Sequence, residues 1–345
     1  MGVASIESMA DDGARQATGL ELITSGDKIY FAERGETKAD LAEHYLRVAE
    51  PLMRAVGGRP VLLQRFPEGA SGPNFFQKRV PKNKPAWLQT AIVETPNGTT
   101  SEALVAADLD HLLWAVNLGC LGFHVWPYLA ADADHTDELR IDLDPTPGVD
   151  FSHIQRAAAE LRLLLDEVGV TGYPKTTGNR GLHVYVRLQP RWDAYQVRSA
   201  AVAIARELER RRPELITAAW WKEERGSRVF VDFNQNAPHK TVFGVWSVRA
   251  RPGAQVSTPV SWDEIDHIHP DQFTIASMPE RLEQVGDLWR GINDDLQSLE
   301  PFLAMDERDK ANGLLDAPWP PVYPKQPGEP PRVQPSRARK PEATT

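Results

Sequence analysis

Segments with strand periodicity and segments with helical periodicity follow one another along most of the chain, and this alternation limits the fold more than any other feature. In residues 182–186, LHVYV, apolar side chains alternate with His183 and Tyr185, as in a strand buried on one face. Residues 150–170 instead repeat apolar side chains at helical spacing. Strands interleaved with helices in this way predict an α/β or α+β fold with a mixed sheet.

The same periodicities predict the other main elements. Helices are expected over residues 38–56, 100–119 and 192–211 and from residue 261, and strands over residues 22–31, 59–66, 120–128, 138–144, 182–188, 227–233 and 241–248. The helix over residues 100–119 is expected to begin with Thr100 or Ser101 as its cap and to end at Gly119. The polar residues 67–85 are expected to form a long loop.

Composition divides the chain into three regions. Residues 1–19 indicate a disordered leader, residues 20–312 one unit of two packed lobes, and residues 313–345 a Pro-rich tail that is disordered or lies along the surface. Apolar runs stay well below the roughly 18 residues that a membrane span needs, and the N-terminus lacks the features of a secretory signal. Cys120 is the only cysteine, which excludes a disulfide framework. We therefore expect a cytoplasmic protein.

The charge balance bears on nucleic-acid binding. A formal net charge of −9 and a pI of about 5.6 argue against binding through bulk charge. A local basic patch is still compatible with this average, and residues 78–84 contain four basic side chains directly after Phe75 and Phe76. Adjacent aromatic residues beside cations can stack on bases, although a buried hydrophobic anchor would explain the two phenylalanines as well.

Acidic residues stand at the ends of two predicted strands. In ELRIDLDPTPG, Asp142 and Asp144 point to the same face of a strand, about 6.6 Å apart, before a Pro-Thr-Pro-Gly turn. Asp232 ends the apolar strand SRVFVDF. Three converging carboxylates would suit Mg²⁺ or Mn²⁺, and two such ions can activate an attacking oxygen and stabilise a leaving one. A turn residue and a helix cap would explain Asp142 and Asp144 almost equally well.

Two other enzyme classes fit part of this pattern. The residues DLDPT match the D-x-D-x-T loop of haloacid-dehalogenase-type phosphotransferases, in which the first aspartate is a nucleophile and the second a general acid. That fold also needs a later acidic pair, and Asp294-Asp295 stand at a predicted helix start instead of a strand end. A sugar-nucleotide transferase with a D-x-D metal site is a further alternative.

A glycine-containing loop lies between the two acidic strands. In KTTGNRGLHVYV, Gly178 and Gly181 permit tight turns with exposed N–H groups, and the neighbouring side chains add donors and positive charge. This chemistry suits a triphosphate, although a glycine loop or an isolated strand histidine is weak evidence by itself. The candidate phosphate ligands are Thr177, Asn179, Arg180, Gly181 and His183.

Together these motifs resemble the polymerase domain of bacterial ligase D, the end-joining enzyme, within the archaeo-eukaryotic primase superfamily. The resemblance covers roughly residues 20–310 and rests on LITSGDKIYF, GRPVLLQRFPEG, NFFQKRVP, VNLGCLGFHVWP, RIDLDPTPG, TTGNRGLHVYV, RVFVDFNQN and TVFGVWSVRARPGAQVSTPVSWDEI in this order. It implies a primase-polymerase catalytic domain of the primase-like α/β class, with a mixed or antiparallel, RRM-like central sheet flanked by helices and a smaller N-terminal α/β lobe.

The resemblance also implies an activity. A DNA-dependent nucleotidyltransferase would add ribo- or deoxyribonucleotides to a 3′-OH at gaps or ends in DNA repair and non-homologous end joining, with two Mn²⁺ or Mg²⁺ ions held by Asp142, Asp144 and Asp232. Primer synthesis de novo, a phosphotransferase and a non-catalytic DNA-end-binding module stay open as alternatives. The implied nucleotide-binding residues are His124, Thr177, Asn179, Arg180, Gly181, His183, Lys240 and Arg249, and the implied DNA-binding residues are Lys28, Lys38, Arg65, Phe75, Phe76, Lys78 and Arg79.

Several positions depart from the family pattern. Asn179 stands where the family has Lys, and Gln235 where it has Arg, so we expect weaker nucleotide binding. Ser25 replaces an Asn that, with two lysines matched by Lys28 and Lys38, holds the 5′-phosphate at a gap. Because no ligase domain accompanies the polymerase, we expect a monomeric, stand-alone relative in the bacterial cytoplasm, associated with the nucleoid. Its expected partners are gapped or broken DNA, NTPs or dNTPs, an end-binding protein and a separate ligase, and not a membrane.

Overall fold

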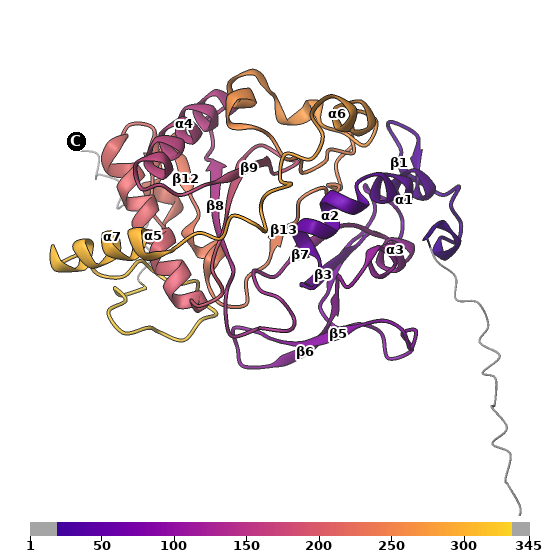
Figure 1. Ribbon diagram of the computed structural model, residues 1–345, viewed down its shortest axis with the longest axis horizontal. Helices are drawn as coiled ribbons and strands as arrows, with labels where there is room; N and C mark the ends of the chain where they lie inside the picture. Colours follow the sequence, from indigo (N-terminus) through magenta and orange to yellow (C-terminus); the bar gives the residue numbers. More distant parts are fainter. Residues whose placement is uncertain (1–18, 333–345) are drawn as a thin grey trace, which may run out of the picture.

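The computed structural model describes residues 19–332, so nearly all of the predicted leader and the last part of the predicted tail lie outside the described residues. Two large β-sheets stand next to each other, each with its own helices (Figure 1). In the view of Figure 1 the five-stranded sheet lies to the left with α4 and α5, and the six-stranded sheet lies to the right with α1, α2 and α3. Among the helices of residues 19–332, none has both the length and the apolar character needed to cross a membrane.

The five-stranded sheet has the order β11-β12-β8-β10-β9. Its central strand β8 (Glu138–Pro145) runs antiparallel to β10 (Leu182–Arg187) and β12 (Val229–Val231), and only β11 (Ile216–Thr217) is parallel to its neighbour. Edge strand β9 (Tyr173–Thr176) pairs with β10. The apolar residues of β8 pack with α4 (Phe151–Glu167) and α5 (Ala194–Arg211), which leaves the opposite face of the strand to its polar residues.

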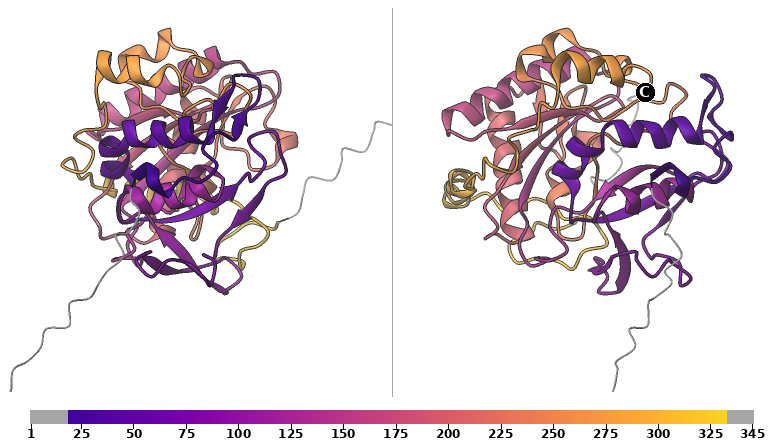
Figure 2. Two further views of the ribbon diagram at one scale, coloured as in Figure 1. Left: turned by 90° about the vertical axis from the view of Figure 1, so that its right-hand side faces the viewer. Right: turned by 45° about the vertical axis from the view of Figure 1, so that its right-hand side comes forward.

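The six-stranded sheet has the order β13-β7-β3-β6-β5, with β4 added on β3. The α1 and α2 helices lie over one face of this sheet (Figure 2). A separate pair of short strands, β1 (Ile29–Phe31) and β2 (Glu36–Thr37), precedes them. The bounds are β3 (Pro60–Arg65), β4 (Phe75–Gln77), β5 (Thr90–Glu94), β6 (Thr100–Val105), β7 (Cys120–Val125), β13 (Val242–Phe243), α1 (Lys38–Arg47), α2 (Ala49–Val56) and α3 (Leu109–Asn117).

The prediction of one helix over residues 100–119 is wrong. Residues 100–105 form β6, which pairs with β5 and β3, because a partner strand distant in the sequence overrides the local helical spacing. The helix begins only at Leu109, where the Asp108 side chain accepts the N–H of His111 as its cap. The predicted helix over residues 38–56 is divided at Val48 into α1 and α2.

The predicted loop over residues 67–85 contains a strand. Residues 75–77 form β4, in which Phe75 pairs with Arg65 and Phe76 with Gln64. Strand β5 was not predicted, and the helix expected from residue 261 is the short 3₁₀ helix η4 (Trp262–His267). The remaining elements are η1 (Gly19–Leu22), η2 (Lys222–Glu224), η3 (Phe233–Asn236), η5 (Pro270–Gln272), α6 (Met278–Val285) and α7 (Glu300–Ala311).

Candidate active site

Three carboxylates meet at one end of the five-stranded sheet. Asp142 and Asp144 project from the same face of β8, and Asp232 follows β12 as the cap of η3. The backbone N–H of Asp232 donates to the carbonyl of Asp142 at 3.0 Å, which continues the β12–β8 pairing to this position. One carboxylate oxygen from each of the three residues lies within 4.8 Å of the others. The alternation of β8 and the pairing of β12 therefore bring the predicted carboxylates together.

The charges of this cluster are unfavourable without a cation. Burial raises the pKa of Asp142 to about 7 against the attraction of Lys175 and Arg249. Burial, and then the charge of Asp142, raises the pKa of Asp144 to about 7, and burial with both neighbouring carboxylates does the same for Asp232. Oδ1 of Asp142 is buried and makes no hydrogen bond among the described residues, although Nε2 of His183 lies 3.2 Å from it. Three carboxylates this close, with their charge poorly compensated by their surroundings, fit a hard divalent cation such as Mg²⁺ or Mn²⁺.

His183 lies behind this cluster and is held from the far side by Lys175. Nε2 of His183 lies 3.2 Å from Oδ1 of Asp142, and Nδ1 lies 2.9 Å from Nζ of Lys175. The amine also donates to the carbonyl of Phe243 at 3.0 Å and to Oγ of Ser257 at 2.6 Å. Because the Ser257 hydroxyl donates its own proton to the Thr176 carbonyl, it must accept from the amine.

The protonation of Lys175 decides the tautomer of His183. As an ammonium group, Lys175 would direct its third proton to Nδ1 of His183, and Nε2 would then carry the proton that faces Asp142. Burial lowers the pKa of Lys175 well below its ordinary value, and it lowers that of His183 as well. The sequence analysis did not single out Lys175, although it stands two residues before Thr177 in the quoted loop.

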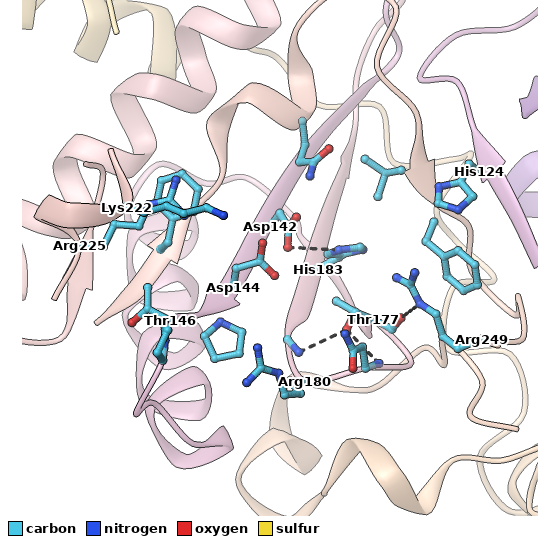
Figure 3. A pocket seen from close by; sticks show the side chains of 18 of the residues that line it. His124, Asp142, Asp144, Thr146, Thr177, Arg180, His183, Lys222, Arg225 and Arg249 are labelled. Carbon is cyan, nitrogen blue, oxygen red and sulfur yellow. Dashed lines mark hydrogen bonds and ion pairs between the residues drawn. The ribbon is translucent and has the colours of Figure 1, made fainter. Parts of the chain in front are cut away.

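A cavity of about 620 Å³ opens beside the carboxylates (Figure 3). In Figure 3, Asp142 and Asp144 face His183. Thr177 and Arg249 lie on one side of the space, and Lys222 and Arg225 lie on the other. This arrangement places the cluster between two groups of cations. The predicted candidates that line the cavity are His124, Asp142, Asp144, Thr177, Asn179, Arg180, Gly181, His183 and Arg249.

The glycine loop between β9 and β10 forms one wall of the cavity. Oγ1 of Thr177 accepts the N–H groups of Asn179 at 3.1 Å and Gly181 at 3.3 Å, so the loop uses two of its own donors to hold its shape. Gly178 has a φ of +68°, which favours glycine. A Cβ atom at Gly181 would lie 2.5 Å from the carbonyl oxygen of Leu143 on β8. The loop therefore packs against the acidic strand more closely than any side chain at Gly181 would allow.

Two further predicted residues line the same wall. The Arg249 guanidinium lies 3.5 Å from the ring centre of Phe243 and donates to the Thr177 carbonyl at 2.8 Å. Nε2 of His124, on β7, is buried without a hydrogen-bond partner among the described residues. Burial and the nearby cations lower the pKa of His124 to about 3, so its imidazole is neutral at pH 7. Both groups are available to a ligand in the cavity.

The opposite wall carries cations that the sequence analysis did not select. Lys222 is exposed on η2, and Arg225 donates to the carbonyls of Ala219 and Trp220 while its guanidinium lies 3.4 Å from the ring centre of Phe230. Phe230 pairs with Asp144 in the β12–β8 register, which explains why Arg225 reaches the cluster. The signal in the sequence was two basic residues, Lys222 and Arg225, shortly before the strand that Asp232 follows.

Lys240 and Gln235 have different places. Lys240 is half-buried and does not line the cavity, although its charge lowers the pKa of Asp232. Gln235, which stands where the family has Arg, lines the cavity and donates to Oδ2 of Asp232 at 3.2 Å. Asp294 and Asp295, the acidic pair considered for a phosphotransferase, do not line the cavity, and Asp295 instead accepts the Tyr173 hydroxyl at 3.4 Å.

The candidate DNA-binding side chains near β4 form one group. Phe75 and Phe76 are 47% and 56% exposed, which disfavours the buried-anchor alternative for both rings. The Arg65 guanidinium lies 5.2 Å from the ring centre of Phe75, and Phe76 packs edge-to-face against His124 of the cavity wall. Lys78 and Arg79 follow on the surface. The exposed pair Phe75 and Phe76 thus lies between the cavity wall and the basic residues Lys78 and Arg79.

The two lysines of the N-terminal segment are already engaged. Nζ of Lys28 donates to the Pro67 carbonyl at 2.8 Å and to Glu68 at 3.1 Å. Nζ of Lys38 donates to the Thr24 carbonyl at 2.8 Å and to Asn117 at 2.6 Å. Both lie apart from the cavity lining, at the start of the six-stranded half of the molecule.

Comparison with known proteins adds independent findings. The family model for "LigD, primase-polymerase domain" matches residues 37–289, more than half of the chain. The multifunctional non-homologous end joining protein LigD of Mycolicibacterium smegmatis is 32% identical over 289 residues, which are 82% of this chain and 38% of that protein. The bifunctional LigD of Bacillus subtilis is 32% identical over 278 residues, 79% of this chain and 44% of that protein. The chain thus spans about two fifths of the length of these relatives.

A solved structure is similar over nearly its whole length. The polymerase domain from Mycobacterium tuberculosis Ligase D, solved in complex with DNA, superposes with a TM-score of 0.74 at 29% sequence identity. The superposition covers 80% of this chain and 98% of that chain.

Proposed function

Because this chain belongs to the LigD primase-polymerase family, we propose that it is a DNA-dependent nucleotidyltransferase that extends a 3′-OH at gaps or broken ends during DNA repair. The similarity to the M. tuberculosis domain also confirms the predicted primase-like α/β fold. End joining is named for the relatives as whole proteins, and we extend it to this chain as part of the proposal. We place its action in the bacterial cytoplasm.

The observation that carries the proposal is the carboxylate cluster beside a cation-lined cavity. Asp142, Asp144 and Asp232 offer hard oxygen ligands within 4.8 Å of one another, and the cavity of about 620 Å³ is large enough for a nucleotide. Divalent ions held there would neutralise the triphosphate and activate the attacking 3′-OH. The elevated pKa values support this assignment, since the cluster is poorly compensated without such charge.

The other residues bind and orient the substrate in this proposal. Arg180 and Arg249 would attract the phosphates, while the Thr177 side chain keeps the glycine loop in shape. His124 has a free buried nitrogen for a hydrogen bond to the nucleotide. His183, held by Lys175, would keep the carboxylate of Asp142 in its orientation. Arg225, on the opposite wall, would neutralise the phosphate charge that lies too far from Arg180 and Arg249.

DNA would lie along the exposed side of β4. Phe75 and Phe76 offer ring faces for stacking on template bases, and the neighbouring cations would contact the phosphates. The M. tuberculosis domain was solved in complex with DNA, which supports DNA binding by this chain. Lys28 and Lys38 each use two of their three ammonium protons on present partners, which leaves one proton of each for a 5′-phosphate.

A primer-extension assay tests the proposal. Wild-type protein is mixed with Mn²⁺, NTPs or dNTPs and a gapped duplex, and we expect extension that is lost in Asp144→Asn and in Asp232→Asn. Exposed Asp294→Asn is the matched control and should extend primers like the wild type, because Asp294 belongs neither to the carboxylate cluster nor to the cavity lining. A phosphotransferase would instead hydrolyse simple phosphate esters independently of Asp232.

Other outcomes select the alternatives. Products on single-stranded template without a primer would indicate de novo primer synthesis. DNA binding without any extension, and with both aspartate variants unchanged, would indicate an end-binding module. Extension that persists in Asp144→Asn and Asp232→Asn would refute the metal assignment.

A further inference from the structure

The part of the Pro-rich tail that the structure describes is packed against the catalytic half of the molecule. After α7 the yellow segment of Figure 1 turns back along α5. Trp319 and Tyr323 are 3% and 5% exposed and form a small apolar cluster with Ala237, the residue that follows η3 as its C-cap. The Tyr323 hydroxyl donates to the Pro238 carbonyl at 2.5 Å. We name residues 316–332 the C-terminal strap.

The strap has an internal order of its own. The buried carboxylate of Glu329 accepts the N–H groups of Trp319 at 2.9 Å and Gln326 at 3.0 Å, and it forms an ion pair with Arg332. The N–H of Asp316 donates to the Gly328 carbonyl at 3.2 Å, which closes the segment into a loop. Such cross-links hold a proline-rich segment in one conformation although it contains neither helix nor strand.

One buried cation joins the strap to α5 and η3. Arg198 of α5 is 1% exposed, and its guanidinium lies 3.8 Å from the ring centre of Trp319. It donates to Asp316 at 2.9 Å and to the Ala317 carbonyl at 2.9 Å. Its Nε donates to Oδ1 of Asn234 at 2.7 Å. A planar guanidinium with all these partners leaves little freedom to any of the three elements that it joins.

Asn234 links Arg198 and the C-terminal strap to the carboxylate cluster. Its side-chain amide donates to the Pro318 carbonyl of the strap at 3.0 Å, and its oxygen accepts Arg198. Its backbone N–H donates to Oδ1 of Asp232 at 3.1 Å. The side chain of Asn234 is thus clamped between α5 and the strap, while its backbone orients Asp232.

We propose that the C-terminal strap positions Asp232 through Asn234 and so tunes cation binding by the carboxylate cluster. The strap lies beyond residues 37–289, the range that the family model matches, so this support is supplied by a segment outside the matched domain. The inference rests on the proposed function only in treating Asp232 as a cation ligand. Trp319 and Asn234 are positioning residues in this account.

The test measures Mn²⁺ binding by electron paramagnetic resonance in full-length variants, at a temperature where circular dichroism shows each one folded. Trp319→Ala should loosen the strap and weaken Mn²⁺ binding roughly 10- to 100-fold, as expected for groups that orient metal ligands. Asn234→Ala should weaken it to a similar extent. Val322→Ala is the matched control, because Val322 belongs to the strap but is 64% exposed, and it should bind like the wild type.

The double variant Trp319→Ala/Asn234→Ala separates positioning from general stabilisation. If the strap acts through Asn234, the double variant binds Mn²⁺ no more weakly than either single variant, since both remove the same link. Unchanged Mn²⁺ affinity in folded Trp319→Ala, or effects that multiply in the double variant, would overturn the inference.

The readout also keeps this inference distinct from the proposed function. If the wild type binds Mn²⁺ and Trp319→Ala weakens this binding, but the wild type extends no primer, the positioning role of the strap stands and the proposed polymerase activity is refuted. If the wild type extends primers but folded Trp319→Ala binds Mn²⁺ normally, the polymerase activity stands and the role of the strap is refuted. Absence of Mn²⁺ binding in the wild type would overturn both.

Discussion

Neutralising Asp144 should stabilise the metal-free protein, although it should abolish activity. Burial and the neighbouring Asp142 raise the pKa of Asp144 from 3.8 to about 7. Between these two values the folded protein keeps a proton that the unfolded chain has released, so the free energy of unfolding falls as the pH rises through this window. Asp144→Asn removes this pH-dependent loss, and it breaks no hydrogen bond, because within residues 19–332 no group donates to the Asp144 carboxylate.

The size of the effect follows from the shift. One pKa unit corresponds to about 1.4 kcal/mol, so a rise from 3.8 to about 7 gives about 4 kcal/mol as an upper figure. Asp144 is half-buried and water screens part of the repulsion, so we expect a gain of about 2 kcal/mol at pH 8 and almost none at pH 4. For a chain of this size that gain corresponds to a rise in melting temperature of about 3 °C.

The assay is differential scanning calorimetry in EDTA at several pH values. Glu207→Gln is the control of opposite sign, because arginine hydrogen bonds outweigh burial and hold the pKa of Glu207 at about 2. Its neutralisation should lower the melting temperature at pH 8 and lose this effect only in strong acid. An Asp144→Asn protein that melts below the wild type at pH 8, or a difference independent of pH, would refute the reasoning.

Three other substitutions give separate tests. Lys175→Met leaves the carbonyl of Phe243 and its other buried partners without a donor, so urea denaturation should show a loss of roughly 2–4 kcal/mol in the free energy of unfolding, and an unchanged midpoint would contradict the network. Gly181→Ala places a Cβ atom 2.5 Å from a carbonyl oxygen of β8, so the KM for nucleotide should rise at least about tenfold, whereas Gly291→Ala, with an ordinary contact of 3.5 Å, should not change it. Phe76→Ala should weaken binding of gapped DNA by roughly 1–3 kcal/mol in fluorescence anisotropy without a change in melting temperature, and equal affinity would rule out stacking by this ring.

The sequence predicted the elements whose pattern is local. Strand alternation in residues 138–144 places Asp142 and Asp144 on one face, and the apolar run before Asp232 predicts a strand end, so the three carboxylates could be proposed as one cluster. Family motifs added the fold and the class of enzyme, which the comparisons support independently.

The features that it missed depend on contacts between distant segments. Residues 100–105 have helical spacing in the sequence but pair with β5 and β3, and only those partners decide for a strand. Lys175 is a single polar residue in a short strand, and its role becomes visible only when Phe243 and Ser257 are folded against it. The composition of the Pro-rich tail left open whether it is disordered or lies along the surface, and in the part of the chain that the structure describes the partners Arg198 and Asn234 decide for the surface.

The most direct test of the carboxylate cluster is a crystal structure with Mn²⁺, a non-hydrolysable NTP and a primer–template duplex, recorded at the manganese absorption edge. We expect anomalous density in contact with Asp142, Asp144 and Asp232, with the triphosphate on the Thr177–Arg249 side of the cavity. Manganese peaks elsewhere, or a nucleotide bound without cations beside these three aspartates, would contradict the account.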